Sequence, residues 1–174
     1  AATLKYEDDS HNWKNAEICR YNGVQFLGVD KLKTQVALTF SKYYTSTDDG
    51  STYTQLTKDD ITFAEPTGSM KSYQVTPTLV DDPTGKKKYY TKSSTGVYTL
   101  VPNKDEVNAA IGADKAEIRK DGKAYYFVPI RHLATDPTTV GYYGVVRNHF
   151  YKINLTGLTG FGTPVYNSAQ EIDP

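Results

Sequence analysis

The feature that most constrains the fold is a succession of short β-type segments separated by turn-forming residues. The 174 residues include 15 tyrosines and 22 threonines but only one methionine and one tryptophan. Tyrosine and threonine fit the half-buried surface of a pleated strand and are mediocre helix formers. Eight or more strands at short spacing, with a single short helix, predict an all-β protein of the sandwich class.

Three segments read as β-hairpins. In residues 18–26, Asn22 and Gly23 separate short apolar pieces, a pattern typical of a type I′ turn because both central residues take positive φ. A second hairpin is predicted around residues 93–96. The clearest pattern is residues 116–128, where an Asp-Gly pair forms the expected tip.

Other strands follow from alternation and turn residues. From Thr34 the chain places Val36, Leu38 and Phe40 on one face, which predicts a strand. The turn residues around Asp48 and Asp49 would close it. Further short strands are predicted at residues 53–56, 61–64 and 72–76.

One segment carries a helix signal. Asn103 is a favoured N-cap residue, an acid stands at the third helical position, and Gly112 follows the apolar run. The signal predicts a helix of two turns at most.

Charge excludes one class of partner. Lysine plus arginine and aspartate plus glutamate number 20 each, so the chain lacks the net positive charge that nucleic-acid binding requires. The only dense basic run, Lys86 to Lys88, follows a turn signal and is interpreted as the edge of a solvated loop rather than as a polyanion site. The four Asp-Asp pairs lack the spacing of a calcium loop and are interpreted as turn residues.

Nothing in the sequence supports catalysis. Cys19 is the only cysteine, so an intrachain disulfide is excluded, and it is interpreted as a small buried hydrophobe. No G-x-S-x-G or phosphate-binding motif is present. His11, His132 and His149 lie too far apart for a local zinc motif. We expect no enzyme activity, no metal and no cofactor.

Residues 151–156 alternate cleanly and predict a half-buried strand with Tyr151, Ile153 and Leu155 on its apolar face. Continued backward, the same alternation places Arg147 and His149 on that face together with Val145. An unpaired buried guanidinium costs several kcal/mol. We therefore expect either a β-bulge near Asn148 or hydrogen bonds from this polar triplet to its neighbours, and in both cases a structural role.

Three segments carry a family resemblance. They are GKAYYFVPIRH (122–132), YGVVRNHFY (143–151) and the glycine-rich segment Gly157-x-x-Gly-x-Gly-Thr163-Pro164. Over residues 120–165 the chain resembles the fimbrillins of Bacteroidales, most nearly those of the short (minor) fimbriae. The resemblance implies a transthyretin-like β-sandwich of about seven to nine strands. It also implies that residues 16–174 form the C-terminal domain of a two-domain pilin, with residues 1–15 as a linker or lead-in.

The resemblance further implies a structural subunit that is exported through the outer membrane, matured by proteolysis and assembled on the cell surface by donor-strand exchange. Its partners would be other copies of the subunit and accessory fimbrial subunits, with host proteins or other bacteria as targets of adhesion. Val145, Arg147, Asn148, His149, Tyr151, Ile153 and Leu155 would form a structural strand of the family. Val165, Tyr166 and Ile172 would lead toward a donor strand, although the chain ends at Asp173-Pro174, where family members continue.

The alternative function is a carbohydrate-binding β-sandwich module. The many tyrosines would then form a stacking platform on one flat face. An apolar groove beside an edge strand would instead favour strand exchange.

Overall fold

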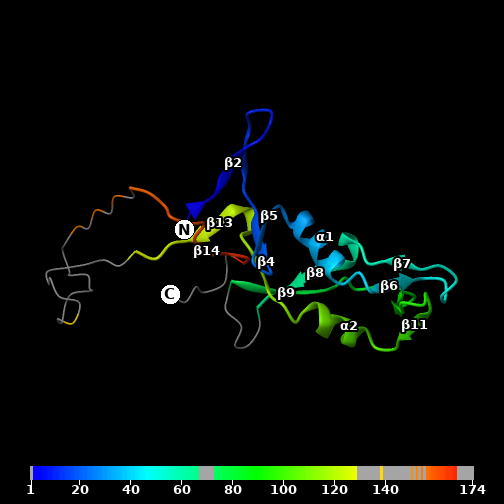
Figure 1. Cartoon of the computed structure of the whole chain (residues 1–174). Helices are drawn as coiled ribbons and strands as arrows, with labels where there is room; N and C mark the ends of the chain where they lie inside the picture. The colour runs from blue at the N-terminus through cyan, green and yellow to red at the C-terminus, as the bar shows by residue number, and fades with distance from the viewer. Residues whose placement is uncertain are drawn as a thin grey trace.

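The computed structural model describes residues 2–66, 73–128, 138, 150, 152, 154 and 156–167. Within these residues the chain is mostly β-sheet with two short α-helices, consistent with the all-β sandwich class. The four-stranded and the three-stranded sheets lie on opposite sides of a central five-stranded sheet (Figure 1). All the strand pairs in these sheets are antiparallel.

The central sheet has the strand order β5-β4-β12-β9-β8. Its strands are β5 (Val24–Leu27), β4 (Ile18–Tyr21), β12 (Ala116–Ile118), β9 (Gln74–Leu79) and β8 (Ile61–Ala64). β4 and β5 form the hairpin predicted at residues 18–26, with φ of 47° at Asn22 and 78° at Gly23. That prediction is confirmed, because two adjacent residues in the left-handed region fix a type I′ turn.

The four-stranded sheet has the order β11-β10-β6-β7. Its strands are β11 (Tyr98–Val101), β10 (Lys88–Lys92), β6 (Tyr43–Ser46) and β7 (Thr54–Gln55). β10 and β11 confirm the hairpin predicted around residues 93–96. The three-stranded sheet has the order β1-β13-β14, with β1 (Ala2–Thr3), β13 (Lys123–Tyr125) and β14 (Thr163–Pro164).

The first fifteen residues, expected as a linker or lead-in, contain three strands. β1 pairs with β13, while β2 (Lys5–Glu7) and β3 (Trp13–Asn15) form a hairpin that projects away from the three sheets (Figure 1). In all, the described residues contain fourteen strands, most of them two to four residues long, where about seven to nine were expected.

The strand predicted from Thr34 is wrong. Residues Val29–Thr39 form the helix α1, whose buried residues are Leu32, Val36 and Ala37, while Leu38 is 60% exposed. Leu32 and Val36 are four residues apart and lie on the same face of the helix, as the helical period of 3.6 residues requires, so the alternation of Val36, Leu38 and Phe40 was coincidental. α1 packs on β4, β5 and β8 and supplies part of the core.

The predicted helix at residues 104–111 is confirmed as α2 (Lys104–Ile111). The Asn103 side chain accepts a hydrogen bond from the Asp105 amide at 2.8 Å, and Gly112 is the C-cap. Val107 and Ile111 are fully buried against the core. Because α1 was missed, the expectation of a single short helix is also wrong. Neither helix, nor any other helix in the described residues, is long and apolar enough to cross a membrane.

The hairpin predicted at residues 116–128 is wrong in its pairing. Asp121 and Gly122 have the positive φ values of a hairpin turn, 54° and 74°, and lie within the 3-10 turn η2 (Lys120–Gly122). However, β12 pairs with β4 and β9, whereas β13 pairs with β1 and β14. The turn therefore carries the chain from the central sheet to the three-stranded sheet.

Candidate functional site

The three-stranded sheet is held together by few strand pairs. β13 contributes two residue pairs to β1 and two to β14. Both edge strands are two residues long, and β14 contains a proline, which cannot donate to a ladder. Short edges and edge prolines limit uncontrolled pairing with other chains. The ladder alone does not explain how residues 157–167 are held.

Arg119 anchors this returning segment. It stands at the end of β12, is only 7% exposed, and donates from Nε to the Phe161 carbonyl at 2.9 Å and from a terminal nitrogen to the Gly162 carbonyl at 2.5 Å. Its guanidinium also lies 5.9 Å from the centre of the Phe161 ring. Burial lowers the pKa of Arg119, yet the group stays charged because an arginine pKa is so high. The planar fork suits two adjacent carbonyls, which a lysine could not bind in the same way.

Glycine and tyrosine complete the contact. Gly162 has φ of 65°, and a Cβ atom there would lie 2.5 Å from the Tyr125 carbonyl oxygen. The Tyr126 hydroxyl donates to the Gly160 carbonyl at 2.9 Å. The glycine at position 162 thus lets the backbone of the glycine-rich segment 157–164 approach β13 closely.

Two of the residues expected to lead toward a donor strand lie in this segment. Val165 is 4% exposed, and its backbone exchanges hydrogen bonds with Lys120 and Lys123 at 3.0 and 3.2 Å. Tyr166 packs against the core and lies under the Lys120 ammonium. Both are therefore part of the chain's own fold. Ile172 lies outside the described residues.

A groove opens where β13 ends and β14 begins. It has a volume of about 370 Å³ and is lined by Tyr126, Phe127 and Val128 from one segment and by residues 157–160 and Gly162 from the other. Phe127, Val128 and Leu158 are 52%, 46% and 54% exposed. The lining contains no charged side chain. An exposed apolar groove of this kind is typical of a binding surface for another apolar segment.

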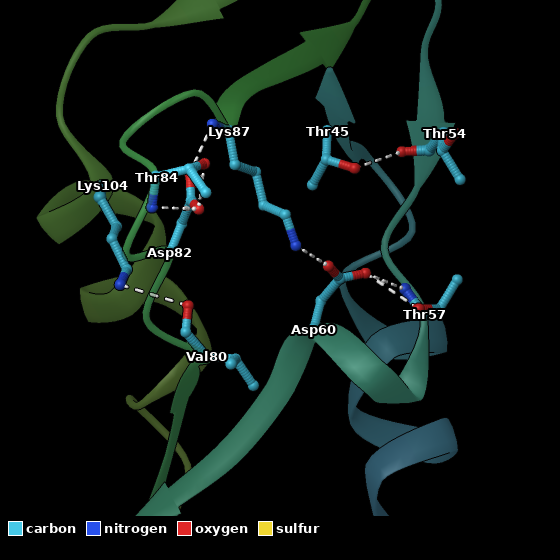
Figure 2. Close-up of polar contacts among 9 residues, drawn as sticks. All are labelled: Thr45, Thr54, Thr57, Asp60, Val80, Asp82, Thr84, Lys87 and Lys104. Carbon is cyan, nitrogen blue, oxygen red and sulfur yellow. Dashed lines mark hydrogen bonds and ion pairs between the residues drawn. The ribbon is translucent and has the colours of Figure 1, made fainter. Parts of the chain in front are cut away.

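A second polar cluster joins the other two sheets (Figure 2). The Lys87 ammonium donates to Asp60 Oδ1 at 2.8 Å, while the Thr57 amide and hydroxyl both donate to Asp60 Oδ2 at 2.9 Å. Asp60 ends the 3-10 turn η1 (Lys58–Asp60) before β8, and Lys87 immediately precedes β10. The Asp-Asp pair at 59–60 therefore does more than form a turn.

The burial of Asp60 raises the pKa of this carboxyl, but the Lys87 ammonium and the Thr57 donors outweigh burial and lower it overall. In the same cluster Asp82 accepts hydrogen bonds from Thr84 and from the Lys87 amide, which lower its pKa to about 2. Asp82 holds its own loop in place, as expected of a turn aspartate, whereas Asp60 also links two sheets through Lys87.

Four tyrosines gather on the four-stranded sheet. The rings of Tyr53 and Tyr98 stack in parallel with centroids 3.8 Å apart, and Tyr90 and Tyr44 meet them edge-on at 4.9 and 5.1 Å. The faces of Tyr53 and Tyr98 are thus turned toward each other. We call Tyr44, Tyr53, Tyr90 and Tyr98 the tyrosine cluster.

Catalytic chemistry has little to build on in the described residues. Cys19 is buried, and burial raises the pKa of its thiol to about 12, which suppresses the reactive thiolate. No group of three or more metal-ligating side chains occurs among the residues that the structure describes.

The predicted structural strand lies outside the described residues; it comprises Val145, Arg147, Asn148, His149, Tyr151, Ile153 and Leu155. Sequence reasoning missed Arg119. Its only signal was a single arginine directly after the apolar Ile118 and before a predicted turn, and that signal does not identify carbonyl partners 42 residues away.

The last third of the chain matches a known family. Residues 119–174 match the family model described as major fimbrial subunit protein type IV, fimbrillin, C-terminal. Neither a curated protein nor a solved structure matches the chain. The matched family consists of structural subunits that polymerise into cell-surface fimbriae, not of enzymes. Arg119, β13, β14 and the apolar groove all lie within the matched residues.

Proposed function

We propose that the chain is a structural subunit of a bacterial surface fimbria. The observation that carries this proposal is the coincidence of the family match with the apolar groove at residues 126–128 and 157–162. A fimbrial subunit needs a surface that other subunits can bind, and this groove offers an uncharged lining with three exposed apolar side chains, Phe127, Val128 and Leu158.

The finer assignment follows the resemblance over residues 120–165. We propose a transthyretin-like β-sandwich over residues 16–174 that is the C-terminal domain of a two-domain pilin of the Bacteroidales short-fimbria type, with residues 1–15 leading into it. Export through the outer membrane, accessory subunits as partners, and adhesion to host proteins or other bacteria belong to the same proposal.

Assembly would use donor-strand exchange. The segments 126–128 and 157–162 continue β13 and precede β14, but neither is in a strand. An extended segment from another copy would lie between them, pair its backbone with theirs and seat alternate apolar side chains against Phe127, Val128 and Leu158. The uncharged lining favours an apolar donor.

The expected site residues then take two roles. One group would form a strand that holds the sandwich together; it comprises Val145, Arg147, Asn148, His149, Tyr151, Ile153 and Leu155. Val165 and Tyr166 would fix the start of the segment that leads through Ile172 toward the donor strand, because both are anchored to the body of the domain.

A matched pair of substitutions tests the groove. Val128→Asp places a charge in it, and Val97→Asp makes the same change at a valine that is 61% exposed next to β11, outside the groove. In cells that export and assemble the chain, Val128→Asp should abolish fibres in electron micrographs and heat-stable ladders on gels. Val97→Asp should leave both unchanged. Normal fibres from folded Val128→Asp protein would contradict the proposal.

The carbohydrate-binding alternative gains no support from the tyrosines. A stacking platform offers free ring faces side by side, whereas Tyr53 and Tyr98 cover each other and Tyr90 is only 8% exposed. The tyrosine cluster instead resembles a small core laid on the outer face of the sheet.

A further inference from the structure

The described part of the fold contains a second cavity, on the side of the four-stranded sheet. It has a volume of about 420 Å³ and lies between the loop that precedes β10 and the segment that joins β11 to α2. This volume is within the range of small-molecule sites, which begins at about 300 Å³. Neither the apolar groove nor the proposed assembly uses it.

One wall of the cavity is apolar. Leu100, Val101 and Pro102 form it, and Leu100 is 47% exposed. Such a wall suits a ligand with a flat C–H face, because burying that face removes apolar surface from water.

The lining also contains five charged residues, which are Lys87, Lys88, Lys104, Asp81 and Asp82. Figure 2 shows Lys87 directed to Asp60 and Lys104 reaching the Val80 carbonyl. The Lys87 ammonium and the Asp82 carboxylate already form hydrogen bonds within the protein. They are therefore a fixed part of the cavity wall.

The other charged side chains form ion pairs that a ligand can displace. Lys104 pairs with Asp81 and Lys88 pairs with Asp49, and the two aspartate side chains are 101% and 82% exposed. Exposed pairs of this kind contribute about 0 to 1 kcal/mol, so an incoming anion can replace either partner with little loss.

Tyr89 adds a phenol to the wall. The residue lines the cavity and is only 5% exposed. Burial and the nearby carboxylates raise the pKa of this phenol to about 12, so the hydroxyl keeps its proton and remains a donor at neutral pH. A phenol on a cavity wall can therefore donate to a ligand oxygen, and such a bond contributes most where water is largely excluded.

We propose that this cavity binds an acidic sugar, a uronic acid unit of a glycan. Its carboxylate would accept hydrogen bonds from Lys88 and Lys104, and its hydroxyl groups would donate to Asp81 and accept from Tyr89. Its C–H face would pack on the apolar wall. A ligand needs both hydroxyl donors and an anionic group to use a lining that contains both carboxylates and ammonium groups.

The test is a titration of the complete, isotope-labelled chain with D-glucuronate, followed by amide chemical shifts. We expect shifts to concentrate at residues 87–89 and 100–104. D-glucose, which lacks the carboxylate, should bind at least about tenfold more weakly, because a charge-assisted hydrogen bond is worth about one factor of ten or more. Acetate should not reproduce the shifts.

Matched variants identify the groups. Lys104→Gln should raise the Kd for glucuronate about tenfold. Lys86→Gln removes the same charge from the adjacent loop, but Lys86 does not line this cavity, so its Kd should stay unchanged. Four results would each overturn the proposal: no binding of glucuronate, equal binding of glucose, equal loss in Lys86→Gln, or acetate shifting the same amides with the same affinity, which would indicate an adventitious ion only.

Discussion

β10 and β13 each have a partner strand on both sides, but they are held in different ways. β10 makes four residue pairs with β6 and four with β11, and the tyrosine cluster covers the outer face of its sheet. β13 makes two pairs on each side and depends on Arg119, on glycines and on the Tyr126 hydroxyl to hold its neighbours. The four-stranded end is held by longer ladders, while the three-stranded end presents the apolar groove. This difference is what a subunit that must bind another copy requires.

The largest effect should come from a turn glycine at the three-stranded end. A Cβ atom at Gly122 would lie 2.4 Å from the Leu4 carbonyl oxygen and 3.1 Å from the Ala16 amide nitrogen, and φ there is 74°. Because backbone atoms cannot move aside, Gly122→Ala should lower the free energy of unfolding by about 3 kcal/mol. Urea denaturation measures it.

The control is a glycine at the four-stranded end. Gly96, in the β10–β11 turn, has φ of 87°, but a Cβ atom at this position would meet no other atom within 4 Å. Gly96→Ala should therefore cost only about 1 kcal/mol, the strain of a left-handed alanine. Equal losses for the two variants would show that close packing at Gly122 does not matter.

A substitution at Arg119 tests how the three-stranded end, unlike the four-stranded end, depends on side-chain contacts. Arg119→Lys keeps the charge but loses the fork that binds the Phe161 and Gly162 carbonyls, and we expect a loss of about 2 kcal/mol. Hydrogen exchange should also become faster at the Val165 amide, since the returning segment is released first. Arg20→Lys, at an exposed position of β4, is the matched control and should change neither quantity. A slow Val165 amide in Arg119→Lys would refute the anchoring role.

Low pH should weaken the Asp60–Lys87 ion pair, which links the central and four-stranded sheets. The folded-state pKa of Asp60 lies below the ordinary value of 3.8, so the charged carboxylate contributes stability above that value, and the contribution is lost as the pH falls below about 4. At pH 7 Asp60→Asn should lower the free energy of unfolding by about 1 to 2 kcal/mol.

The difference between wild type and Asp60→Asn should disappear toward pH 2, as measured by urea denaturation at several pH values. Asp59→Asn, one residue earlier and exposed, should behave as the wild type does. A difference that persists unchanged at pH 2 would argue against the ion pair with Lys87.

The smallest effect concerns the tyrosine cluster. In a double-mutant cycle with Tyr53→Leu and Tyr98→Leu, the stacked pair should show a coupling energy of about 1 kcal/mol in its favour. A coupling energy near zero would mean that the stacked rings add nothing and that strand pairing alone stabilises the four-stranded sheet.

Local signals in the sequence predicted local structure. Asn22 and Gly23 determine their hairpin because the turn needs two positive φ values, and Asn103 and Gly112 bound α2 because both act within one helical turn. Val36 misled because its neighbours fit two periods at once, and the packing of Leu32 against the core decided for the helix.

The pairing of strands that are distant in the sequence could not be predicted from local signals. The turn at Asp121 and Gly122 was identified, but the strands on its two sides take partners from distant segments, among them β9 and β14. The resemblance located the region of the candidate site at residues 120–165. The groove and the contacts of Arg119 depend on how two segments about 30 residues apart meet, and no local pattern encodes that meeting.

The most direct test of the central claim is amide hydrogen exchange on assembled fibres and on the free chain. If the three-stranded end is the assembly surface, residues 126–128 and 157–162 should gain strong protection in the fibre, because their backbone groups pair with a donor strand. Residues 43–46 and 88–92 should be equally protected in both forms. Unchanged exchange at the groove, or new protection confined to the four-stranded end, would contradict the account.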